Sequence, residues 1–159
     1  MPGCFRCGVC CVEYQPRLDL AEAGRIAHEM GISLDEFLKK YADERWPGTQ
    51  SFLLRKRRRA CIFLKRMPDG KQAICLIHPF RPSSCREWVA GWYQRECQEG
   101  LTKYWGLTVG PSGEIQGTAR RIKSFKHRQH KIPAQYSLED LEHDLKVIGK
   151  RRGKMPASY

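Results

Sequence analysis

Four cysteines within eight residues near the N-terminus constrain this chain more than any other feature. The cysteines of the whole sequence are Cys4, Cys7, Cys10, Cys11, Cys61, Cys75, Cys85 and Cys97. The adjacent pair Cys10-Cys11 argues against a simple disulfide framework, because neighbouring half-cystines must diverge to separate partners. Reduced thiols at this local density are typical of a metal site.

The amount of cysteine and the hydropathy pattern narrow the class of protein. Cysteine makes up about 5% of the 159 residues, below the roughly 8–10% of a disulfide-built scaffold. No apolar run precedes Cys4, so we expect no secretory signal peptide. No segment approaches the roughly 20 apolar residues of a membrane helix. We therefore expect a cytoplasmic protein without membrane contact.

The length of 159 residues is expected to give one domain with a tail. We assign residues 1–100 to a cysteine-cluster metal-binding domain and residues 101–149 to a basic hairpin and helix that extend it. Residues 150–159 are expected to form a basic tail. The expected fold class is α+β, a small single metallo-domain with short helices and β-hairpins around a cysteine-rich metal site.

Two short helices are predicted after the first cysteines. Asp19 is expected to cap the first helix with Glu22 as its capping-box partner, and Gly31 to end it. Ser33 and Glu36 repeat the capping pattern for the second helix, which Trp46-Pro47-Gly48 is expected to end.

The middle of the chain predicts strands. Residues 51–58 are expected to form one strand, and the apolar runs 61–64 and 73–77 flank the turn sequence Pro68-Asp69-Gly70. The resulting β-hairpin would carry Cys61 and Cys75 on opposite strands near its open end, within reach of one ion.

A helix opening at Pro82 is expected to carry Cys85 and an aromatic stripe that includes Trp88, Trp92 and Tyr93. We expect the stripe to lie in the core, the helix N-terminus to favour the Cys85 thiolate, and Cys97 to be a buried thiol near the helix end. A second hairpin is predicted over residues 107–116, and a last helix after Ser137.

The spacing Cys4-x2-Cys7-x2-Cys10 allows a short loop to present three thiolates to one centre. Bacterial ferredoxin ligand runs open with this spacing, although here the fourth cysteine, Cys11, follows at once. Structural zinc is the other common use of such spacing, but zinc ribbons and fingers need two paired ligand runs. Both an iron–sulfur cluster and zinc therefore remain open.

The N-terminal Cys-x-x-Cys-x-x-Cys-Cys run, the segment 61–64 and the segment 75–86 together resemble the YkgJ-like cysteine-cluster family. That family is described as a putative zinc- or iron-chelating domain and includes relatives of flagellin lysine N-methylase. The resemblance extends over roughly residues 4–90. It implies a metal-ligand set of Cys4, Cys7, Cys10, Cys11, Cys61, Cys75 and Cys85. His78 stands where the family often has an aromatic residue, which leaves a nitrogen ligand open.

Seven thiolates exceed the four that one zinc ion or one cubane cluster takes. Either two centres are bound, or some of the cysteines lie outside the ligand set. We favour an iron–sulfur cluster, of the [4Fe-4S] type, over zinc, because of the ferredoxin-like spacing and the methylase relatives.

The function predicted from these residues is metal binding with a structural or redox role. The first alternative is a cluster-dependent transferase resembling a protein N-methylase, although no glycine-rich nucleotide-binding sequence is found. The second is an RNA- or ribosome-associated module, suggested by the net charge of +12 and by the basic segments 55–59 and 120–131. No catalytic residue and no oligomeric state can be assigned from the sequence.

Overall fold

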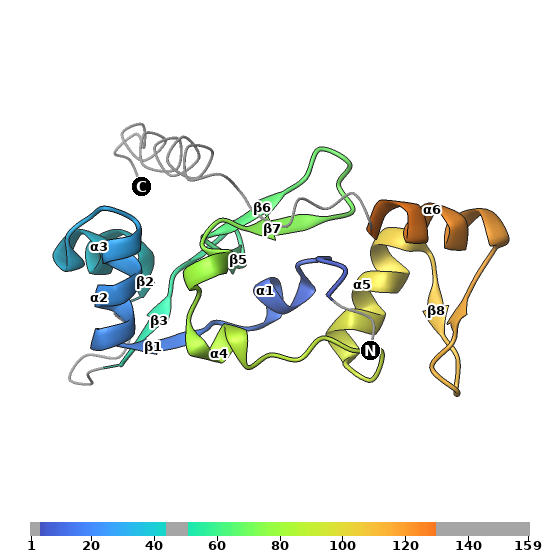
Figure 1. The fold of residues 1–159 in the computed structure, drawn as a ribbon, viewed down its shortest axis with the longest axis horizontal. Helices are drawn as coiled ribbons and strands as arrows, with labels where there is room; N and C mark the ends of the chain where they lie inside the picture. Colours follow the sequence, from blue (N-terminus) through green and yellow to red (C-terminus); the bar gives the residue numbers. More distant parts are fainter. Residues whose placement is uncertain (1–3, 44–50, 130–159) are drawn as a thin grey trace, which may run out of the picture.

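The computed structural model describes residues 4–43 and 51–129, and it joins short helices to small antiparallel sheets. Its elements are α1 (Val9–Glu13), β1 (Arg17–Asp19), α2 (Leu20–Glu29), α3 (Leu34–Tyr41), β2 (Ala42–Asp43), β3 (Ser51–Leu54), β4 (Lys56–Arg57), β5 (Ala60–Cys61), β6 (Leu64–Arg66), β7 (Ala73–Cys75), η1 (His78–Phe80), α4 (Ser83–Arg86), α5 (Arg95–Trp105), β8 (Thr108–Val109), β9 (Ile115–Gln116) and α6 (Ala119–Gln129). The predicted α+β class is confirmed. Figure 1 shows α2 and α3 at one end of the molecule, α6 at the other, and α1 between them.

The two predicted N-terminal helices are confirmed as α2 and α3. The Asp19 carboxylate accepts a hydrogen bond from the Glu22 amide, and the Ser33 hydroxyl accepts one from the Glu36 amide. Gly31 has a left-handed φ of 67°, as expected for a residue that ends a helix. The predicted end at residues 46–48 lies outside the described residues.

The helices α2 and α3 pack against a three-stranded antiparallel sheet of order β1-β3-β2. This arrangement buries the first core, whose members are Leu18, Ala23, Ile26, Ala27, Phe37, Tyr41, Leu54, Ile62, Phe63, Leu76, Ile77 and Phe80. The sequence did not indicate β1, because Arg17–Asp19 is too short for a recognisable alternation of apolar and polar residues.

The single strand predicted over residues 51–58 is wrong. The chain forms β3 and β4 with a break at Arg55, where the amide hydrogen-bonds to the Tyr41 carbonyl and the side chain to the Ala42 carbonyl. A turn through Arg58 and Arg59, both with positive φ, then pairs β4 with β5.

The hairpin around residues 68–70 is confirmed, but its strands differ from the prediction. Leu64–Arg66 pairs with Ala73–Cys75, so Leu64 and not Cys61 lies opposite Cys75. Cys61 belongs to β5 and pairs with Lys56. The expectation that the two cysteines lie on opposite strands of one hairpin is therefore wrong.

The helix predicted from Pro82 to beyond Tyr93 is also wrong. The helix α4 ends at Arg86, and the next helix, α5, begins at Arg95. Val89 and Tyr93 are 55% and 62% exposed, so the apolar and aromatic residues do not form one buried stripe. Cys97 is buried, as expected, but it lies in the first turn of α5.

A second core is buried between the N-terminal loop, α5, the β8–β9 hairpin and α6. Its members are Phe5, Cys7, Val9, Cys97, Leu101, Trp105, Leu107 and Phe125. The β8–β9 hairpin confirms the prediction for residues 107–116. Helix α6 was not predicted, because its basic sequence has few apolar residues, yet buried Phe125 contacts the rings of Phe5 and Trp105.

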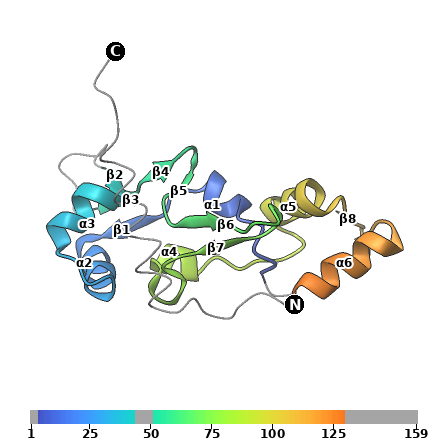
Figure 2. The same ribbon diagram turned by 90° about the horizontal axis from the view of Figure 1, so that it is seen from above.

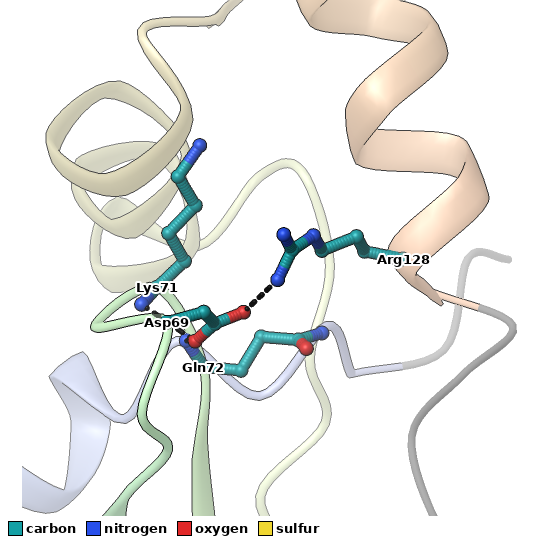
Figure 3. Close-up of polar contacts among 4 residues, drawn as sticks. All are labelled: Asp69, Lys71, Gln72 and Arg128. Carbon is teal, nitrogen blue, oxygen red and sulfur yellow. Dashed lines mark hydrogen bonds and ion pairs between the residues drawn. The ribbon is translucent and has the colours of Figure 1, made fainter.

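Helix α6 is further joined to the β6–β7 turn by an ion pair. Figure 3 shows the Arg128 guanidinium pointing toward the Asp69 carboxylate, at 2.7 Å. Asp69 also accepts hydrogen bonds from the Lys71 and Gln72 amides. Within residues 4–43 and 51–129, the helices lack the length and apolar content needed to cross a membrane. The helix predicted after Ser137 and the predicted basic tail lie outside the described residues.

Candidate metal centre

The N-terminal cysteine loop is fastened to the β6–β7 hairpin. The Ala73 amide donates to the Arg6 carbonyl at 2.8 Å, and the Arg66 guanidinium donates to the Cys7 carbonyl at 2.8 Å. Gly8 has a φ of 74° and sits so close to the hairpin that an added Cβ would lie 3.0 Å from the Ala73 Cβ. Both the backbone conformation and the close approach therefore favour glycine here.

Side chains of β4 and α5 contact the C-terminal end of α1. The Lys56 ammonium donates to the Val12 carbonyl at 2.5 Å and to the Glu13 carbonyl at 3.1 Å, where a cation complements the helix C-terminus. The Tyr14 hydroxyl donates to the Glu96 carboxylate at 2.6 Å, which joins the end of α1 to α5. Helix α1 thus lies against both β5 and α5, and Figure 2 shows it between them.

The eight cysteines are all free thiols and come from α1 and from five other parts of the chain. They lie in the N-terminal loop (Cys4, Cys7), α1 (Cys10, Cys11), β5 (Cys61), β7 (Cys75), α4 (Cys85) and α5 (Cys97). Cys7 and Cys97 are buried, Cys4 is exposed, and the others are half-buried. The prediction that one short loop presents Cys4, Cys7 and Cys10 is wrong for Cys10, because this residue lies in the short helix α1.

On one side of α1, thiols of the loop neighbour Cys97. Burial raises the pKa of Cys7 to about 12, and the thiolates of Cys10, Cys4 and Cys97 raise it further by repulsion. Burial likewise raises the pKa of Cys97, with additional repulsion from Cys4 and Cys10. Packing agrees with this for Cys7 and Cys97, which are both buried in the second core.

On the other side of α1, three thiols from separate elements are neighbours. Burial raises the pKa of Cys75 to about 12, and Cys61 and Cys85 add to the rise by repulsion. Burial raises the pKa of Cys61 and of Cys85 to about 11, and Cys10 repels both thiolates. Cys61, Cys75 and Cys85 thus influence one another electrostatically, although they do not share a hairpin.

Cys10 affects thiols on both sides of α1, since its thiolate raises the pKa of Cys7 and Cys97 and also that of Cys61 and Cys85. Its pKa is raised first by the hydrogen bond with the Cys11 side chain and then by burial. The raised pKa values of Cys4, Cys7, Cys10, Cys61, Cys75, Cys85 and Cys97 favour the neutral thiol at these positions. Among residues 4–43 and 51–129, no three cysteine, histidine, aspartate or glutamate side chains are near enough to hold one ion in this geometry.

The donor set nevertheless fits a thiophilic metal. Thiolate sulfur is the ligand that zinc and iron–sulfur clusters select, and the protein has eight free thiols, two of them in α1 and six in other parts of the chain. Metal binding would have to rotate these side chains toward one another and release their protons.

Two further predictions about individual residues can be compared with the structure. The helix N-terminus was expected to favour the Cys85 thiolate, but burial outweighs the four-residue helix α4 and raises the pKa of the thiol. His78 directs its Nε2 to the Arg81 guanidinium at 3.0 Å, and burial, Arg81 and Arg6 lower its pKa. The structure therefore assigns His78 a contact with Arg81.

Close packing of Cys7 against α5 gives a test of this part of the structure. A Cβ added at Gly100 would lie 2.4 Å from the Cys7 Sγ, whereas one added at Gly24 in α2 would meet nothing within 4 Å. We expect Gly100→Ala to destabilise the protein by about 1–3 kcal/mol. The control Gly24→Ala is expected to stabilise it by roughly 0.5–1 kcal/mol, since alanine favours helix. Denaturant unfolding measures both, and equal effects of the two substitutions would contradict the packing at Cys7.

The fold and these side chains define a small α+β protein with eight free cysteines. The chain belongs to the CxxCxxCC family, described as a putative zinc- or iron-chelating domain, whose family model matches residues 3–98. The resemblance inferred from the sequence is thereby confirmed, and the match extends it to include Cys97. No curated protein and no solved structure gives a match.

Proposed function

We propose that this protein binds metal through its cysteine cluster, with iron–sulfur favoured over zinc, and that the bound metal holds α1 against its neighbours. The observation that carries the proposal is the set of eight free thiols, which α1 and five other parts of the chain contribute. The family description supports chelation of zinc or iron in general. Membership does not distinguish the two metals.

The preference for iron–sulfur rests on the Cys4-x2-Cys7-x2-Cys10 spacing, which is shared with ferredoxin ligand runs. A structural role follows from the position of the thiols, because a metal bridging them would cross-link the loop, α1, β5, β7, α4 and α5. An iron–sulfur cluster would in addition supply one-electron transfer when bound.

The test is a visible spectrum combined with iron, zinc and sulfide analysis on full chain purified without oxygen. Broad absorption near about 400 nm with stoichiometric iron and sulfide is the expected result for a cysteine-ligated cluster. A colourless protein with stoichiometric zinc would retain metal binding and overturn the iron–sulfur assignment. A protein that takes up neither metal would overturn the proposal.

The transferase alternative would need a substrate site beside the cluster. One cavity, of about 840 Å³, lies along α6, and another, of about 490 Å³, lies between α6 and the turn that contains Asp69. Neither is lined by a cysteine. The relation to flagellin lysine N-methylase stays a prediction.

The RNA-binding alternative has its most specific support in α6, a helix of 11 residues that includes five lysines or arginines and no acidic residue. Two of these side chains also make contacts within the protein, because Arg121 donates to the Gly106 carbonyl and Arg128 pairs with Asp69. Binding of RNA that falls steeply with added salt would support this role, and no binding at low salt would end it.

A further inference from the structure

We propose that the cavity between the β6–β7 turn and the last turn of α6 binds a small organic anion, whose carboxylate or phosphate oxygens accept hydrogen bonds from Gln72 and Arg128. The inference is independent of metal binding, because no cysteine lines this cavity. Three observations lead to it: the make-up of the cavity wall, a buried amide without an acceptor, and the charge of the surrounding side chains.

The cavity has a volume of about 490 Å³ and two kinds of wall. Its lining side chains are apolar Met67 and Pro68 and polar Asp69, Gln72, His127 and Arg128. The ion pair of Asp69 with Arg128 joins the turn to the helix across this space. A cavity of this size, with an apolar wall and a few convergent polar groups, is typical of a site for a small molecule.

Gln72 is the residue that points to a ligand. It is only 9% exposed, and its Nε2 is buried yet has no acceptor within residues 4–43 and 51–129. Buried side-chain donors are almost always paired, so an unpaired one needs an explanation. Figure 3 shows the Gln72 carboxamide extending from the β6–β7 turn toward the end of α6 that carries Arg128, which is the helical wall of the cavity.

The carboxylate among the lining side chains does not supply the missing acceptor. The Asp69 Oδ1 accepts from the Lys71 and Gln72 backbone amides at 3.0 and 3.2 Å, and its Oδ2 accepts from the Arg128 guanidinium at 2.7 Å. The guanidinium has further N–H groups besides the one that Asp69 accepts from. The lining side chains therefore offer more donors than acceptors, and an entering molecule would have to supply acceptor oxygens.

The charge around the cavity favours an anion. Asp69 offsets the charge of Arg128, but α6 includes four other lysines or arginines and no acidic residue. The turn adds Lys71, whose ammonium lies 4.8 Å from the centroid of the Trp105 ring. Such an excess of cations raises the local concentration of anions. Because Met67 and Pro68 also offer apolar surface, we expect an organic carboxylate or phosphate monoester and not a bare inorganic ion.

NMR titration of the ¹⁵N-labelled full chain with sodium benzoate and, separately, with phenyl phosphate tests the site. Sodium chloride at matched ionic strength is the reference. We expect at least one probe to shift the side-chain amide signal of Gln72 and the Nε–H signal of Arg128 until they saturate. The side-chain amide signal of Gln94, which already donates to the Val89 carbonyl, should stay in place. The probe with the higher affinity identifies the head group.

Substitutions separate the site from the fold. Gln72→Leu removes the donor at similar size, and replacing an unpaired buried amide by an apolar group should leave stability unchanged or raise it. Probe binding should weaken at least about tenfold, as expected for loss of a hydrogen bond to an anion. Arg128→Gln should also weaken binding. Arg120→Gln removes the same charge from the same helix outside this cavity and should leave the affinity unchanged.

Four results would overturn the inference. The first is no shift of the Gln72 signal with either probe at millimolar concentration, and the second is a shift that sodium chloride reproduces, which would show an adventitious ion only. The third is wild-type affinity in Gln72→Leu. The fourth is a loss of stability in that variant, which would show that water or a protein group already pairs with the amide. The wild-type titration remains decisive if a variant fails to fold.

Discussion

The Cys7→Ser protein is expected to lose metal and cooperative thermal unfolding together. Cys7 lies in the second core beside Cys97 and its backbone carbonyl accepts a hydrogen bond from Arg66, so a metal at this sulfur would join the N-terminal loop to α5. Structural zinc contributes about 10–16 kcal/mol in small metal-dependent folds. Loss of a ligand should therefore affect the second core far more than the loss of one buried thiol would. Metal analysis and a calorimetric scan measure the two effects on one sample.

Val9→Thr is the matched control for this substitution. Val9 is equally buried in the same core, and threonine places a hydroxyl there without removing a ligand. We expect a cost of about 1–3 kcal/mol for the unpartnered hydroxyl, with the metal content unchanged. If Cys7→Ser behaved like Val9→Thr and kept its full metal content, Cys7 would not be a ligand.

Alkaline pH is expected to destabilise the metal-free protein strongly. The folded state raises the pKa of Cys7 and of Cys75 to about 12, mainly through burial, against an ordinary value of 9.0. Below about pH 9 these thiols are neutral in both states, and the folded state keeps its full advantage. Above that pH the unfolded chain ionises first, so stability falls by up to about 1.4 kcal/mol per pH unit and per thiol until the pH reaches about 12.

Denaturant unfolding of reduced, chelator-treated chain between pH 8 and about 10.5 measures this loss, and Cys75→Ala should reduce its slope. The neutral state of the thiols can also be measured by proton release, because metal binds only after the thiols have lost their protons. At neutral pH we expect zinc addition to release roughly four protons per four-thiolate centre, measured with a pH indicator. A flat stability profile together with no proton release would contradict burial of neutral thiols.

Local sequence signals predicted the parts of the fold that short-range contacts determine. The capping pairs Asp19 with Glu22 and Ser33 with Glu36, and the turn at Asp69-Gly70, each depend on residues a few positions apart. The interruption at Arg55 and the early end of α4 depend on contacts between elements, and neither could be inferred from the local pattern. The same holds for α6, which is basic throughout and is held by Phe125 and Arg128.

The candidate site likewise has a part that the sequence predicted and a part that depends on contacts between distant elements. Cysteine spacing and the family resemblance indicated seven of the eight cysteines as ligands. Cys97 was predicted only as a buried thiol, because it stands alone in the sequence, and the helix containing it was placed wrongly. Its position beside Cys7 depends on the close packing of α5 on the Cys7 sulfur, where Gly100 leaves room for that atom.

The loop and α5 lie far apart in the sequence, and this separation affects the order in which they fold during synthesis. Cys7 and Glu96 are 89 residues apart, so the loop leaves the ribosome long before its neighbours in α5 exist. Contacts of such high sequence separation form slowly, because the intervening chain must be ordered first. A metal captured early could bind only Cys4, Cys7, Cys10 and Cys11, which are already available. The second core, which holds the loop against α5, is therefore completed only late in folding, when α5 docks.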